Sequence, residues 1–74
     1  MNKKTILITG AAGFIGSNLC LKIFEKYENI HIIGIDNMNA YYDVNIKKWR
    51  LSEIERAAEK AGVNGSEWNF IEGN

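Results

Sequence analysis

The stretch TILITGAAGFIGSNL, residues 5–19, joins an apolar, β-branched run to three glycines in a G-x-x-G-x-x-G spacing, and a helical pattern follows at once. The run KTILIT, residues 4–9, is apolar on both sides, which is typical of a strand buried on both faces of a parallel sheet. From Phe14 to about Tyr27 the period changes, because Ile15, Leu19, Ile23 and Tyr27 recur every fourth residue. This period predicts a helix that starts directly after the glycines.

The same alternation continues along the chain. Residues 28–36 form a second buried-type strand that ends in Asp36, and residues 37–43 form a loop. Asp43 can cap a second helix, and Gly62 is suited to end it. The apolar stripe of that helix consists of Val44, Leu51, Ile54, Ala58 and Ala61. Residues 67–73 form a third short strand. The order predicts an α/β fold: a partial Rossmann β-α-β-α-β unit with a three-stranded parallel sheet and right-handed crossovers.

Composition narrows the class of protein. The chain has 74 residues, enough for one domain at most, and its nine basic and nine acidic residues give a net charge of zero. No basic excess is present to favour a nucleic-acid or anionic-membrane surface. A single Cys and a single His allow neither an internal disulfide nor a Cys/His zinc cluster, so we expect no metal. The apolar runs are too short for a signal peptide or a membrane span, and we expect a cytoplasmic protein.

The glycines favour a dinucleotide site over simple turns, because a strand precedes them and a helix follows. Gly10 permits the tight turn, Gly13 lets a pyrophosphate approach the backbone, and Gly16 lets the helix pack closely. The free amides around Phe14 and Ile15 and the positive end of the helix dipole favour the phosphates.

An acidic residue stands where the adenosine ribose is expected. Asp36 lies 20 residues past Gly16, at the tip of the second strand. A carboxylate there accepts hydrogen bonds from the ribose hydroxyls and repels a 2′-phosphate, which favours NAD over NADP.

Other residues are interpreted conservatively. We expect Cys20 to be a small buried hydrophobe, His31 a structural histidine, and Trp49 and Trp68 packing residues. Residues 46–60 predict a solvated charged face over the apolar stripe. Tyr41 and Tyr42 either line the adenosine site or pack.

With ITGAAGFIGSNL, IIGIDNMNAYYD and FIEGN taken together, nearly the whole chain resembles the extended short-chain dehydrogenase/reductases. Within that group it is similar to the NAD-dependent sugar-nucleotide epimerases and dehydratases, and most of all to the UDP-glucuronate 4-epimerases. The resemblance implies tightly held NAD, removal of a hydride from C4 of a sugar nucleotide, rotation of the 4-keto intermediate and return of the hydride to the opposite face. The implied cofactor residues are Gly10, Gly13, Phe14, Ile15 and Gly16 at the pyrophosphate, Asp36 and Asn37 at the ribose, and Asn74 where the family usually has an adenine-contacting Asp.

The catalytic Tyr-x-x-x-Lys that the resemblance implies is absent from this chain, because His31, Asn45 and Ile46 stand four residues after its three tyrosines. We therefore expect residues 1–74 to be the amino-terminal portion of the NAD-binding domain, without catalytic residues and inert by itself. A related dehydratase, reductase or decarboxylase, or a non-catalytic nucleotide-binding or interaction module, fits the same residues.

The strand order of such a domain leads to an expectation about self-association. In the 3-2-1 order the first strand has an open edge when no fourth strand follows, and one face of the sheet is bare. We expect a homo-oligomer that forms through that edge or face.

Overall fold

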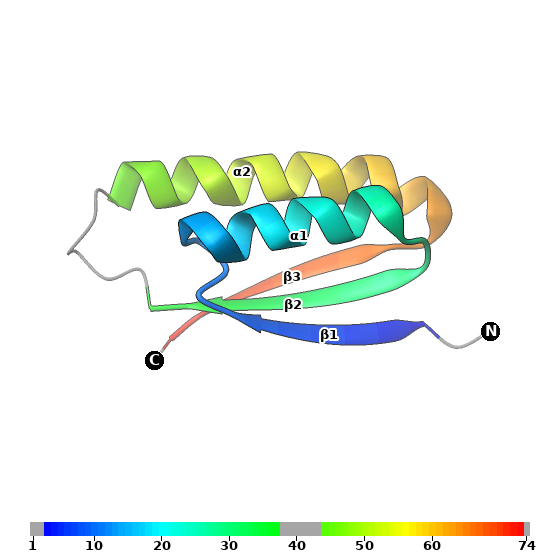
Figure 1. The fold of residues 1–74 in the computed structure, drawn as a ribbon, viewed down its shortest axis with the longest axis horizontal. Helices are drawn as coiled ribbons and strands as arrows, with labels where there is room; N and C mark the ends of the chain where they lie inside the picture. Colours follow the sequence, from blue (N-terminus) through cyan, green and yellow to red (C-terminus); the bar gives the residue numbers. More distant parts are fainter. Residues whose placement is uncertain (1–2, 38–43, 74) are drawn as a thin grey trace.

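The computed structural model describes residues 3–37 and 44–73. The elements are β1 (Lys4–Thr9), α1 (Phe14–Lys26), β2 (Ile30–Asp36), α2 (Val44–Ala61), the 3-10 helix η1 (Gly62–Asn64) and β3 (Glu67–Glu72). The three strands are parallel in the order β1-β2-β3, and both helices lie on one side of the sheet (Figure 1). The predicted partial Rossmann unit is confirmed, while the expected cap Asp43 lies outside the described residues.

The core lies between the sheet and the two helices. In β2, the alternate residues Ile30 and Ile32 are buried beneath the helices, where Ile54 of α2 also lies. Trp68 packs against this cluster, with its ring edge-on to Phe24 at a centroid distance of 6.4 Å. A side chain at Gly34 would collide with the Trp68 ring, so the glycine makes room for the tryptophan. The packing role predicted for Trp68 is therefore confirmed.

The α1 helix is confirmed, but the apolar stripe seen in the sequence is not its buried face. Ile15 is 81% exposed, and Leu19 and Tyr27 are exposed as well. Ser17, Cys20 and Phe24 are buried instead, while Ile23 is the member of the stripe that packs against the core. The small side chains of Ser17 and Cys20 let the first part of the helix pack closely, which large side chains at these positions would prevent.

α2 buries its predicted stripe where the structure describes it. Ile54 and Ala61 are buried, and Leu51 and Ala58 pack against the core. α2 ends at Ala61, but Gly62 does not terminate the helical path, because the chain continues into η1. The left-handed residue is Gly65, with φ +85°, whose N–H donates to the Gly62 carbonyl. The predicted end of the α-helix just before Gly62 is therefore confirmed, whereas the left-handed cap expected at Gly62 lies at Gly65, after η1.

Trp49 and the charged face of α2 also differ from expectation. Trp49 is 62% exposed, so it does not pack within the described part of the chain. Lys47, which was assigned to the solvated face, is buried. No helix among the described residues is long and apolar enough to cross a membrane.

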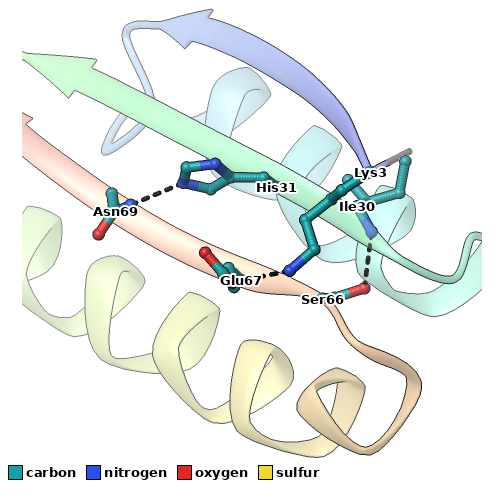
Figure 2. Close-up of polar contacts among 6 residues, drawn as sticks. All are labelled: Lys3, Ile30, His31, Ser66, Glu67 and Asn69. Carbon is teal, nitrogen blue, oxygen red and sulfur yellow. Dashed lines mark hydrogen bonds and ion pairs between the residues drawn. The ribbon is translucent and has the colours of Figure 1, made fainter. Parts of the chain in front are cut away.

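No described element covers the sheet face opposite the helices (Figure 1). Its polar end holds two side-chain contacts: Lys3, the residue before β1, pairs with Glu67 of β3 at 2.7 Å, and the Asn69 amide donates to His31 Nε2 at 2.6 Å (Figure 2). Hydrogen bonding to Lys3 lowers the pKa of the Glu67 carboxyl. Its apolar end includes Leu7, which is 61% exposed. β1 thus has the predicted open edge, and the sheet has the predicted bare face. His31 makes a structural contact, as expected.

Burial makes the Cys20 thiol hard to ionise. Desolvation raises its pKa from the ordinary value of 9.0 to about 11. Between these two pH values the Cys20 thiol keeps its proton in the folded state, whereas the unfolded chain has lost it. The contribution of the thiol to stability is therefore complete below pH 9 and is lost as pH rises towards 11.

We predict that the folded chain reacts slowly with a thiol reagent at pH 8 and that urea exposes a rapidly reacting cysteine. In urea titrations, the difference in unfolding free energy between wild type and Cys20→Ala should shrink as pH rises from 9 to 11. A thiol that reacts as fast in the folded chain as in urea contradicts the buried position.

Candidate functional site

The glycine turn that joins β1 to α1 is held by backbone hydrogen bonds. Gly10 has φ +67°, a left-handed conformation that glycine adopts without strain. The Gly13 N–H donates to the Gly10 carbonyl at 3.0 Å, and the Ala11 N–H donates to the Ile35 carbonyl at 3.1 Å. The turn is thereby closed on itself and fixed to the carboxyl end of β2.

Gly16 lets the first turn of α1 fold back over this loop. A Cβ at Gly16 would fall far inside the contact distance of the Gly10 carbonyl oxygen and close to the Ala11 backbone. A Cβ at Gly13 would lie 3.2 Å from the same oxygen, a tight contact. The close packing predicted for Gly16 is therefore present, but it is made against the glycine turn.

The start of α1 carries a positive electrostatic character. The helix has no acidic residue in its first turn. Its first intrahelical bond runs from the Ser17 N–H to the Gly13 carbonyl, at 2.9 Å. The preceding amides, those of Phe14, Ile15 and Gly16, have no acceptor within the helix. Such amides favour an anion, as does the positive end of the helix dipole.

Asp36 stands at the carboxyl end of β2 and is only 5% exposed. Its Oδ2 accepts the Ala12 N–H at 3.1 Å. Its Oδ1 accepts a hydrogen bond from the Lys47 ammonium at 2.9 Å. Lys47 is itself only 6% exposed. The carboxylate therefore joins the glycine turn to α2 through a buried ion pair.

Arg50 lies three residues after Lys47 and reaches the glycine turn. Its Nη1 donates to the Ala12 carbonyl at 3.3 Å, and its guanidinium lies 5.8 Å from the centre of the Phe14 ring. The guanidinium is held by both contacts beside the first residue of α1. It adds a second cation to this edge of the sheet.

These groups meet in one cavity of about 940 Å³ at the carboxyl ends of β1 and β2. It contains one carboxylate and two cations, so the described lining carries a net positive charge. Of the predicted cofactor residues, Asn74 lies outside the described residues, as do Tyr41 and Tyr42. All the others line the cavity: Gly10, Gly13, Phe14, Ile15, Gly16, Asp36 and Asn37. Within residues 3–37 and 44–73, no cluster of three or more His, Cys, Asp and Glu side chains could hold a metal ion.

Sequence reasoning missed Lys47 and Arg50, which also line the cavity. A signal for Lys47 was present, because it lies seven residues before Ile54 and so falls on the apolar stripe of α2. A charged residue on a buried face needs a partner, and Asp36 is the acid at the end of the preceding strand.

Comparison with known proteins assigns the family. The model of the NAD-dependent epimerase/dehydratase family matches residues 6–69, most of the chain. This chain belongs to that family. The matched segment contains the glycine turn, Asp36 and both cations of the cavity.

Several curated proteins are similar to this chain in sequence. Protein CapI of Staphylococcus aureus is 49% identical over 66% of this chain and 14% of its own length. The UDP-glucuronate 4-epimerase of Thermodesulfobacterium geofontis is 43% identical over 69% of this chain and 15% of its own. UDP-glucuronate 4-epimerase 4 of Arabidopsis thaliana is 39% identical over 76% of this chain and 12% of its own. The alignment thus spans 12–15% of the length of these relatives.

A solved structure supports the fold. The matching structure is a multidomain structure of adenylation, ketoreductase and pseudo Asub domains of a keto acid-selecting NRPS module. The alignment covers 99% of this chain and 6% of the length of that one. The TM-score is 0.73 and the identity is 19%, so the likeness concerns the backbone fold alone.

The packing of α1 on the glycine turn predicts a position-specific effect of added methyl groups. Gly16→Ala should destabilise the chain by about 2 kcal/mol or more, because backbone atoms must move. Gly62→Ala is the matched control, since a Cβ there meets nothing within 4 Å, and it should change stability by less than about 1 kcal/mol. Urea titration measures both, and equal losses contradict the packing argument.

Proposed function

We propose that this chain binds NAD, with the diphosphate against the glycine turn and the adenosine ribose at Asp36. The observation that carries the proposal is the single cavity that combines the glycine turn, the uncompensated start of α1 and a strand-end carboxylate. Membership in an NAD-dependent family supports it.

The cavity residues fit the chemistry of the cofactor. The first amides of α1 donate to an anion, and Arg50 adds a fixed positive charge beside them. Asp36 provides carboxylate oxygens for ribose hydroxyls, and Asn37 follows it on the rim. Asn74 is proposed at the adenine, where its amide oxygen would accept from the exocyclic amino group.

We propose further that residues 1–74 are the amino-terminal portion of the NAD-binding domain of a sugar-nucleotide epimerase. The similarity to UDP-glucuronate 4-epimerases over 12–15% of their length supports this. Bound NAD would take up a hydride from the sugar and return it. The residues of this chain would hold and orient the ADP side of the cofactor.

The chain by itself is proposed to be catalytically inert, since it contains no Tyr-x-x-x-Lys to activate a sugar hydroxyl. A dehydratase, reductase or decarboxylase of the same family remains the alternative for the parent activity, with a non-catalytic binding module as a further one. The coding sequence downstream of Asn74 distinguishes an enzyme from the binding module, because a Tyr-x-x-x-Lys followed by a sugar-binding portion indicates an enzyme. The buried thiol of the single cysteine suits the proposed reducing, cytoplasmic setting.

The binding proposal predicts weak, glycine-dependent affinity for NAD. In an NMR titration, wild type should shift resonances of the glycine turn, and Gly13→Val should lose most of this binding because its side chain occupies the approach of the diphosphate. Gly62→Val is the matched control, because Gly62 is outside the cavity. Unchanged binding by Gly13→Val contradicts the diphosphate position, and no binding by wild type contradicts the function proposed for this chain.

We also propose that the chain self-associates through the β1 edge or the uncovered sheet face, where Leu7 is exposed. Light scattering should find a dimer or larger assembly that Leu7→Lys shifts towards monomer. Val63→Lys adds the same charge in η1, which follows α2 on the helix side of the sheet (Figure 1), and should leave the assembly intact. A monodisperse monomer of the wild type at high concentration would falsify this proposal.

A further inference from the structure

Lys47 holds a charge in a place where charge is costly. It is the fourth residue of α2, is 6% exposed, and lines the candidate cofactor cavity. Lysine is rarely buried to this extent without a partner. Here the partner is Asp36, whose Oδ1 lies 2.9 Å from the ammonium. The acid expected to select the cofactor is therefore already paired with a cation.

This pairing changes the argument about a 2′-phosphate. A lone carboxylate repels a second anion, but a carboxylate in contact with an ammonium is close to neutral as a pair. The charge of Asp36 alone therefore cannot account for discrimination against NADP. Discrimination against NADP depends instead on whether the Lys47 ammonium is held by Asp36 or is available to a 2′-phosphate.

We propose that Lys47 is a specificity-determining residue of the cofactor site, an inference that rests on the NAD-binding function proposed above. While Asp36 holds the Lys47 ammonium, the pair accepts the unphosphorylated ribose and offers no free cation to a 2′-phosphate. When Asp36 is replaced by a neutral residue, the Lys47 ammonium becomes available as a ligand for the phosphate.

Arg50 is the other cation of the cavity, but it is committed elsewhere. Its contacts are the Ala12 carbonyl and the Phe14 ring, both at the glycine turn. Lys47 is the cation in direct contact with the strand-end acid. The adjacent Lys48 is exposed and is absent from the cavity lining, so it provides a control of equal charge.

The test measures, for each variant, the ratio of the dissociation constants of NAD and NADP, two ligands that differ only in the 2′-phosphate. Because both need the same folded chain, the ratio is independent of any fraction that a variant leaves unfolded. The variants are Asp36→Asn, Lys47→Met, the double variant of both, and Asp36→Asn with Lys48→Met.

Asp36→Asn should move the ratio towards NADP by about tenfold or more, the size of a hydrogen bond to a charged group. The double variant with Lys47→Met should lose most of this gain, and the one with Lys48→Met should keep it. Lys47→Met alone should move the ratio further against NADP, because the acid is left uncompensated.

Two failures are distinguishable. If wild type binds NAD but Asp36→Asn shows the same ratio with and without Lys47, the role of Lys47 is wrong and the binding function stands. If wild type binds neither cofactor, both proposals are overturned.

Discussion

The buried Asp36 carboxylate is the interaction on which the site depends. It accepts one hydrogen bond from the Ala12 N–H in the glycine turn and another from the Lys47 ammonium on α2. Three segments distant in sequence are thereby held at the carboxyl edge of the sheet. Removing one member of such a pair leaves a buried charge without compensation, which costs about 3–5 kcal/mol. The shape of the cavity and the stability of the unit are therefore coupled through this one side chain.

Several features were predictable because they follow from local pattern. The buried-type run before Gly10, the 3.6-residue period after it and the acid at the end of the second strand indicate strand, helix and strand-end carboxylate without tertiary information. Parallel topology then brings Gly10 and Asp36 to the same edge. Their meeting in one cavity follows from chain order and from the direction of the strands.

The errors arose where packing distance or pairing overrides hydrophobicity. In α1, the large residues Ile15 and Leu19 are exposed while Ser17 and Cys20 face inward, because a helix tight against its neighbours needs small side chains on that face. In α2, the charge of Lys47 suggested solvent, whereas its position on the apolar stripe buries it against Asp36. The spacing of hydrophobic residues does not reveal where a helix packs closely on its neighbours, nor which charged residue has a partner on another element.

The uncovered sheet face and the cavity share a border. Ile35 has its side chain on that face, and it also lines the cavity together with Thr9, its partner in the register. Leu7 lies two residues before Thr9 on the same face. Any surface that covers this apolar end would therefore exclude water from one wall of the cavity. Excluding water would strengthen the attraction of the first amides of α1 for a bound anion. Covering the sheet would consequently favour the cofactor binding that we propose, and bound cofactor would favour the covered state.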